Sequence, residues 1–270
     1  MALIADVFVT IKPERERLAL TKRSLRSLVE NTDPSQFRLT VCVDGTELLE
    51  LPADASSEQV SALRYIGARL HQDANYVLQS SRNEGLGPTI NRALSHIDSI
   101  NRWYSDPMVG DPSRVAPYVV MCQDDLLYTK DWLPILASRF RAYGMQHSLG
   151  FASGIECVEH PVKRDLGGGI VLKDWIRASQ MLSTREYWMS LMPIPAFDPE
   201  TGRLRARPND GMGSGVDWWL IRNHENSVCR TGRTCLVMPG LVQHAGYDRS
   251  TWLKRELPES ESDKERMRNA

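Results

Sequence analysis

The sequence predicts an α/β fold in which a mostly parallel central sheet is flanked by helices. Short, β-branched apolar runs alternate with segments of helical periodicity up to about residue 145, and such alternation is typical of parallel sheets. The chain has 270 residues, enough for one large domain with a buried core. Its 41% apolar and 25% charged residues lie in the range of ordinary globular proteins, which excludes wholesale disorder and fibrous architectures.

Four apolar runs predict the strands of the first half: residues 5–11, 37–43, 76–78 and 118–122. The last of them is almost continuously apolar, so we expect it at the centre of the sheet. Helical spacing of apolar residues predicts helices over residues 13–31, from Ser57, and over 90–97 and 131–140. Pro13 suits a first helical turn, and Ser57 is a candidate N-cap.

The second half is less regular. Residues 150–156 and 170–172 resemble strands, and residues 184–192 and 216–223 resemble short helices. Residues 193–215 are rich in Pro, Gly and Arg and are expected to form a loop. Since no linker is evident, we expect one domain over residues 1–253, with halves at 1–135 and 136–253, and a disordered tail over residues 254–270.

The charge balance and the cysteines limit the classes of function. The 33 basic and 34 acidic side chains nearly cancel, which disfavours binding to nucleic acid or membrane through net charge. No apolar run is long enough to span a bilayer, and Asp6 interrupts the first apolar run, which is atypical of a signal peptide. The 5 cysteines are an odd number without a framework spacing, so reduced thiols in the cytoplasm are expected.

The clearest chemical signal is the pair Asp124-Asp125, which directly follows the apolar strand ending at Cys122. Ligands of open α/β sheets bind at the carboxyl ends of strands. A hard cation such as Mg²⁺ or Mn²⁺ prefers carboxylate oxygens and keeps positions open for substrate phosphates. The alternative is that the two residues only form a turn and cap the next element.

Two further features are expected at the same edge of the sheet. Asp44 ends the second strand before Gly45, where its carboxylate could accept hydrogen bonds from a base or a sugar, or simply form an Asp-Gly turn. Asn83-Glu84-Gly85 precedes a helix, where glycine lets the backbone approach a phosphate or sugar. An ordinary loop is the alternative, since neither the P-loop pattern nor the dinucleotide fingerprint is present.

Asp217 and His244 are the candidates from the second half. Asp217 follows three alternating glycines at an expected helix start, which suits an acid that meets a substrate after a loop closes. It could instead only stabilise the helix N-terminus. His244 ends a late apolar run and could ligate Mn²⁺, although a structural histidine is the commoner case.

In this order, the pieces resemble a glycosyltransferase of the GT-A (Rossmann-like) fold, similar to glycosyltransferase family 2. The resemblance covers roughly residues 5–250 and rests on motifs at Val7-Phe8-Val9-Thr10, Ser24-Leu25, Asp44-Gly45-Thr46, Asn83-Glu84-Gly85 and Gln123-Asp124-Asp125. The last corresponds to the metal motif of the family. The chain departs from the pattern at Gln123, where an acid is usual, and around Asp217, where the family's Glu-Asp pair is missing.

The resemblance implies a metal-dependent, inverting glycosyltransferase whose partner is a nucleoside-diphosphate sugar. It implies Mn²⁺ or Mg²⁺ bound by Asp125 and His244, with Asp217 as catalytic base. Asp210 and Glu156 are the next acids to test if Asp217 is not the base. The resemblance assigns nucleotide-sugar binding to Thr10, Asp44, Asn83, Gly85 and Asp124.

Two other functions stay open: a non-catalytic nucleotide- or sugar-binding protein on the same fold, and a nucleotidyltransferase. The latter is disfavoured because no Gly-rich, basic triphosphate loop follows the first strand. The donor sugar, the oligomeric state and the acceptor are not identified. Protein, glycan, small molecule and hydroxylated nucleic-acid base all remain as acceptors, and the near-zero net charge disfavours the last.

Overall fold

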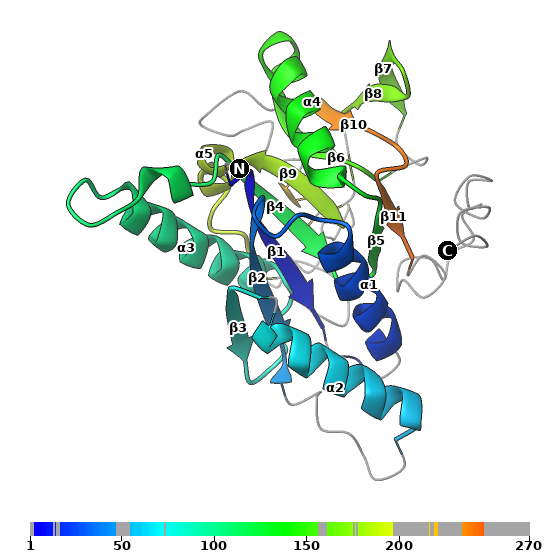
Figure 1. Cartoon of the computed structure of the whole chain (residues 1–270). Helices are drawn as coiled ribbons and strands as arrows, with labels where there is room; N and C mark the ends of the chain where they lie inside the picture. Colours follow the sequence, from blue (N-terminus) through cyan, green and yellow to red (C-terminus); the bar gives the residue numbers. More distant parts are fainter. Residues whose placement is uncertain are drawn as a thin grey trace.

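The computed structural model describes residues 3–12, 14, 17–46, 55–72, 74–155, 161–174, 176, 178–196, 216, 219–220 and 234–245. Strands and helices alternate through the first half, as predicted (Figure 1). The helices are α1 (Leu18–Glu30), α2 (Ser57–Gln72), α3 (Leu86–Ser105), the 3-10 turn η3 (Pro112–Arg114), α4 (Trp132–His147) and α5 (Arg185–Ser190). The strands are β1 (Ala5–Ile11), β2 (Phe37–Asp44), β3 (Tyr76–Ser80), β4 (Tyr118–Gln123), β5 (Leu126–Tyr128), β6 (Leu149–Ser153), β7 (Val162–Gly167), β8 (Ile170–Lys173), β9 (Gln180–Thr184), β10 (Thr234–Val237) and β11 (Val242–His244).

Within the described part of the chain, one sheet of 9 strands runs in the order β3-β2-β1-β4-β9-β6-β10-β8-β7. The first four strands in that order pair in parallel. β9 is antiparallel to both β4 and β6, and β8 is antiparallel to both β10 and β7. Since β6 and β10 are parallel, every strand except β8 and β9 points the same way. The predicted fold class, a mostly parallel sheet flanked by helices, is confirmed.

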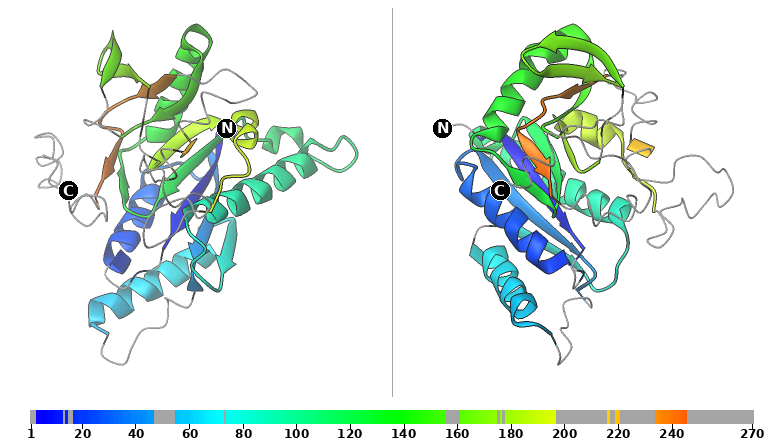
Figure 2. Two further views of the ribbon diagram at one scale, coloured as in Figure 1. Left: turned by 180° about the vertical axis from the view of Figure 1, so that it is seen from behind. Right: turned by 90° about the vertical axis from the view of Figure 1, so that its right-hand side faces the viewer.

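Helices cover the two faces of this sheet, as Figures 1 and 2 show. The core is divided accordingly, because successive side chains of a strand point to opposite faces. Val7 and Val9 of β1 belong to the cluster that contains Leu25 of α1, along with residues of α2 and α4. Phe8 belongs to the other cluster, with residues of α3 and with Trp188 of α5. The two clusters thus pack against opposite faces of the parallel strands and fix the positions of the strand ends.

A buried ionic network lies at the opposite end of β1 from the site. Arg38 Nη2 donates to Asp6 Oδ2 at 2.8 Å and to Asn101 Oδ1 at 3.2 Å. Asn101 Nδ2 in turn donates to Asp6 Oδ2 at 2.7 Å, and its Oδ1 accepts from the Ala116 N–H. Asp6, Arg38 and Asn101 are all buried, so each charge has a partner, as burial requires. This network joins β1, β2 and α3 and explains why an acid interrupts the first apolar run.

Some predicted element boundaries differ from the structure. α1 begins at Leu18, so the helical start expected at Pro13 is wrong: Glu14 is not helical, and Pro13 itself lies outside the described residues. The three glycines at 167–169 have φ of +82°, +62° and +76° and make the turn of a β7–β8 hairpin. Only the first few residues of the loop expected at 193–215 are described, and the tail at 254–270 lies outside the description.

β9 was not expected from the sequence. It is a strand of five residues that owes its place to pairing with β4 on one side and β6 on the other. A short run of this kind has too little periodicity to be recognised without its partners. Across the described helices, none combines the length and apolar character required to cross a bilayer.

Candidate functional site

The carboxyl ends of β1, β2 and β4 lie at one edge of the sheet, because these strands are parallel neighbours. β2 ends at Asp44, and β4 ends at Gln123, directly before Asp124 and Asp125. All three carboxylates are buried. The structure thus brings together the acids that the sequence placed after separate strands, at the edge where ligands of such sheets bind.

Arg17, the N-cap residue of α1, and the first turns of that helix hold the Asp124–Asp125 pair in place. Arg17 Nη2 donates to Asp124 Oδ1 at 2.9 Å and to Asp125 Oδ2 at 2.8 Å. Thr21 Oγ1 donates to Asp124 Oδ2 at 2.8 Å. Further along the helix, Ser24 Oγ accepts from the backbone N–H of Leu126 at 3.1 Å, which fixes the chain just after the pair.

Sequence reasoning missed Arg17 and Thr21, although a signal for them exists. They are four residues apart and therefore lie on one face of a helix. That helix follows the strand that pairs with the strand carrying the acids, so this face meets the acids. The signal was hidden because the segment before Leu18 resembles an ordinary solvated charged stretch.

Burial and neighbouring charges shift the protonation of these groups. Loss of water raises the pKa of the Asp124 carboxyl to about 6; Arg17 opposes this rise, and the charge of Asp125 adds to it. For Arg17, burial lowers the pKa, but Asp124, Asp125 and Glu14 outweigh it, so the pKa of the guanidinium is raised. Arg17 is therefore a permanent cation against this acidic pair.

His244, which is more than 100 residues further along the sequence, lies beside the Asp124–Asp125 pair. β11 is antiparallel to β5 and places His244 opposite Leu126, the residue that follows the pair. Its Nε2 lies 3.6 Å from Asp125 Oδ2, and the backbone N–H of Ala245 donates to the carbonyl of Asp125 at 2.8 Å. The structure thus brings together the two metal ligands that the resemblance implied.

The donor set fits a hard divalent cation. Asp125 Oδ1 is buried and has no hydrogen-bond partner among the described residues, which is costly for a carboxylate oxygen unless a cation binds it. No group of three or more His, Cys, Asp or Glu side chains suited to a metal occurs in the described ranges. Mg²⁺ and Mn²⁺ commonly use one or two protein carboxylates together with water and substrate phosphates, and Asp125 can supply such a carboxylate.

The carboxylate of Asp44 fixes the position of the Asn83–Gly85 loop through hydrogen bonds. Its Oδ1 accepts from the Glu84 N–H at 2.8 Å and from Ser80 Oγ at 3.1 Å, and its Oδ2 accepts from the Gly85 N–H at 2.9 Å. Asn83 Oδ1 also accepts from the Gly85 N–H, at 3.1 Å. Gly85 has φ of +91° directly before α3, a conformation that side chains disfavour.

The remaining predicted residues are placed as follows. Thr10 is buried near the end of β1, and its Oγ1 donates across to the carbonyl of Cys122 on β4 at 3.4 Å. Asp217 lies outside the described residues, as do the alternatives Asp210 and Glu156. Its neighbours Val216 and Leu220 are described, and both are buried in the same core cluster as α3.

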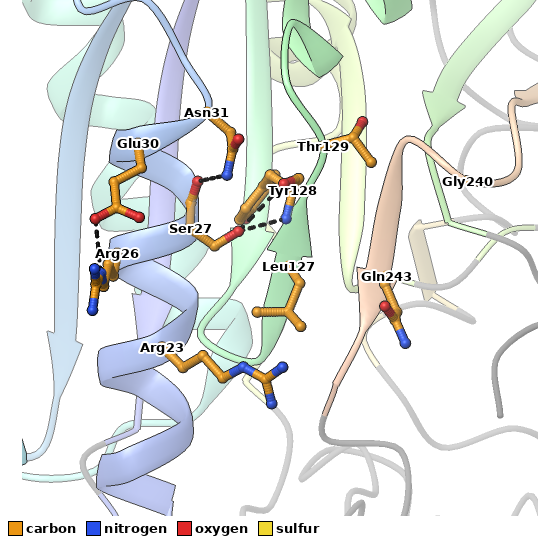
Figure 3. A pocket seen from close by; sticks show the side chains of 10 residues that line it. All are labelled: Arg23, Arg26, Ser27, Glu30, Asn31, Leu127, Tyr128, Thr129, Gly240 and Gln243. Atoms are coloured by element: carbon orange, nitrogen blue, oxygen red, sulfur yellow. Dashed lines mark hydrogen bonds and ion pairs between the residues drawn. The ribbon is translucent and has the colours of Figure 1, made fainter. Parts of the chain in front are cut away.

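A cavity of about 620 Å³ is lined by residues of α1 and of the β5 and β11 segments (Figure 3). Gln243 and Leu127 are register partners that line it, whereas His244 and Leu126, one residue along, point to the opposite face. Arg23 and Arg26 contribute cations to its wall. Asp124, Asp125 and His244 are not among the residues that line this cavity.

The chain resembles solved structures in fold. Neither the protein-family models nor the curated proteins gave a match to the sequence. The structure of GalNAc-T7 with UDP, GalNAc and Mn²⁺ matches with a TM-score of 0.51 at 10% identity, over 90% of this chain and 44% of that one. The chain has the GT-A fold.

Other GT-A structures match more weakly. The mannosyltransferase PcManGT from Pyrobaculum calidifontis, in complex with GDP-Man and Mn²⁺, has a TM-score of 0.45 at 13% identity, over 89% of this chain and 56% of that one. For TarS from S. aureus the TM-score is 0.46 at 12% identity, over 88% of this chain and 35% of that one. The chain thus spans between about a third and just over half of each of these three solved chains.

Proposed function

We propose that the protein is a metal-dependent, inverting glycosyltransferase that moves a sugar from a nucleoside-diphosphate sugar to a hydroxyl acceptor. The observation that carries this proposal is the buried Asp124–Asp125 pair at the end of β4. Asp125 Oδ1 has no hydrogen-bond partner in the described part of the chain, and His244 Nε2 lies 3.6 Å from Asp125 Oδ2. The GT-A fold supports the proposal, since the similar GalNAc-T7 structure holds UDP, GalNAc and Mn²⁺.

Asp125 and His244 would hold Mn²⁺ or Mg²⁺, and the bound ion would neutralise charge that develops on the leaving diphosphate. Asp124 would face the ribose, held in place by Thr21. Among the described residues, three hydrogen bonds from the loop and Ser80 use three of about four acceptor positions on the Asp44 carboxylate, and the fourth would accept from the nucleotide base. Thr10, Asn83 and Gly85 complete the donor site, which we assign to residues 1–135.

The acceptor reaction needs a base on the face of the sugar away from the diphosphate. Asp125 lies on the diphosphate side and Asp44 is bound to its loop, so we assign this role to Asp217 in the second half, with Asp210 and Glu156 as alternatives. As the acceptor oxygen forms its bond to the anomeric carbon, the bond from that carbon to the diphosphate breaks, and the acceptor proton passes to Asp217.

The cysteine usage suits a reducing compartment. Cys42 and Cys122 are buried thiols, and the 5 cysteines of the chain are an odd number without a framework spacing. We therefore propose a cytoplasmic location, where thiols stay reduced.

The test is a titration of the whole chain with a panel of nucleotide sugars, with and without Mn²⁺, followed by an assay for released nucleoside diphosphate. Mn²⁺-dependent binding and release of the diphosphate in the presence of an acceptor support the proposal. Binding without release, whatever acceptor is offered, supports a non-catalytic binding protein. Release of pyrophosphate from a nucleoside triphosphate and a sugar phosphate supports a nucleotidyltransferase.

A further inference from the structure

One nitrogen of Arg17 bridges the two acids of the site. Nη2 lies 2.9 Å from Asp124 Oδ1 and 2.8 Å from Asp125 Oδ2, so a single positive group occupies the position between the carboxylates. Both acids are only 3% exposed, whereas the Arg17 side chain is 24% exposed. The carboxylates are buried within the protein, and the Arg17 side chain that contacts them is partly exposed.

Arg17 contacts the carboxylate that a bound metal would also use. Asp125 Oδ2 accepts from Arg17 and lies 3.6 Å from His244 Nε2. A divalent cation held by Asp125 and His244 would therefore share the Asp125 carboxylate with the guanidinium. Two positive charges that share one carboxylate in a partly buried site repel each other strongly. The pair of acids carries two negative charges, which one divalent cation neutralises without Arg17.

Asp124 has a second anchor that does not depend on Arg17. Thr21 is buried on the next turn of α1, and its hydroxyl donates to Asp124 Oδ2, the oxygen that Arg17 does not contact. If Arg17 leaves, Asp124 keeps this hydrogen bond. The acidic pair can thus exchange one cation for another without being rebuilt.

We propose that Arg17 is an internal counter-ion, which occupies the cation position of the site in the metal-free protein and gives way to the divalent metal. This inference rests on the proposed function, because it takes Asp125 and His244 as the metal ligands. Arg17 then lowers the apparent affinity for the metal and keeps the metal-free acids from destabilising the fold. Once released, its guanidinium is free to pair with phosphate oxygens of the donor.

The experiment is a Mn²⁺ titration followed by electron paramagnetic resonance, without nucleotide, on the wild type, Arg17→Met and Lys22→Met. Lys22→Met is the matched control: it removes one positive charge from the same helix, but its ammonium contacts Ser61 Oγ and the Tyr65 ring. We expect Arg17→Met to bind Mn²⁺ about tenfold more tightly than the wild type, and Lys22→Met to stay within about twofold. In thermal melts, Arg17→Met should be less stable without Mn²⁺ and gain more stability from it.

Equal or weaker Mn²⁺ binding by Arg17→Met overturns the proposal and leaves the metal-dependent function intact. A wild type and an Arg17→Met variant that both fail to bind Mn²⁺ overturn the metal site and this inference together. If Arg17→Met does not fold, a crystal structure of the Mn²⁺-bound wild type decides. Arg17 Nη2 displaced from both carboxylates supports the exchange, and Nη2 still within hydrogen-bond distance of both overturns it.

Discussion

The carboxylate of Asp44 accepts a hydrogen bond at 2.9 Å from the backbone N–H of Gly85, 41 residues further along the chain. This contact joins the end of β2 to the start of α3 and sets the position of the Asn83–Gly85 loop. Two further donors, the Glu84 N–H and Ser80 Oγ, meet the same carboxylate. One acid thus fixes the loop that forms an edge of the proposed donor site.

Asp44→Asn should destabilise the protein and weaken nucleotide-sugar binding. The amide replaces one accepting oxygen with an NH₂ group that faces a donor, so a backbone N–H of the loop loses an acceptor. The free energy of unfolding should fall by about 1–3 kcal/mol, measured by urea denaturation. Ser80→Ala is the control, because it leaves both backbone hydrogen bonds of Asp44 intact and should cost less; an equal loss in the two variants would contradict the anchoring role.

Asp125→Ala should abolish Mn²⁺-dependent nucleotide binding and leave the fold intact, because a carboxylate at a strand end contributes little packing. His244→Ala should weaken the Mn²⁺ requirement less, since the acid, the diphosphate and water still bind the ion. Calorimetric titration of each variant with the donor, with and without Mn²⁺, measures both effects. The control is Asp174→Asn, which alters an exposed acid that pairs with Lys163. Wild-type affinity of Asp125→Ala in the presence of Mn²⁺ would exclude Asp125 as a ligand.

Asp217→Asn should leave donor affinity within a few-fold and reduce turnover by about two to four orders of magnitude, the usual contribution of a general base. Steady-state release of nucleoside diphosphate measures this, and calorimetry checks the donor affinity. Near-normal turnover would move the assignment to Asp210 or Glu156, which should be replaced next by the matching amides.

Cys42 and Cys122 should resist thiol reagents in the native protein. Burial raises the pKa of each thiol to about 12, so the reactive thiolate is absent at pH 8. The folded-state pKa lies above the ordinary value of 9.0, so each thiol contributes stability that is complete below pH 9 and is lost as the pH rises toward about 12. Mass spectrometry after alkylation should find both labelled only in denaturant, and rapid native labelling would refute this placement.

Asp6→Ala should be among the most destabilising single changes outside the site. It leaves Arg38 charged, buried and without its carboxylate, which costs about 3–5 kcal/mol. Chemical denaturation measures the loss, and Asp33→Ala, at an exposed acid that caps a turn through Ser35, is the control. A loss of under about 1 kcal/mol would show that water replaces Asp6 around Arg38.

The sequence by itself determined the α/β class, the parallel first four strands of the sheet and the edge at which the acids gather. Each of these follows from local pattern: apolar runs that stop at Asp44 and at Gln123, with helical spacing between them. In a parallel sheet, residues that follow strands share one edge, so Asp44, Asp124 and Asp125 could be grouped without coordinates.

Only the tertiary structure decided which groups meet these acids. Arg17 and Thr21 contact Asp124 from more than 100 positions away, and His244 reaches Asp125 through the pairing of β11 with β5. The strand β9 is defined by its neighbours β4 and β6 in the same way. Such contacts depend on the register and packing of segments that are distant in the sequence. The local pattern of residues in one segment does not predict which other segment it contacts.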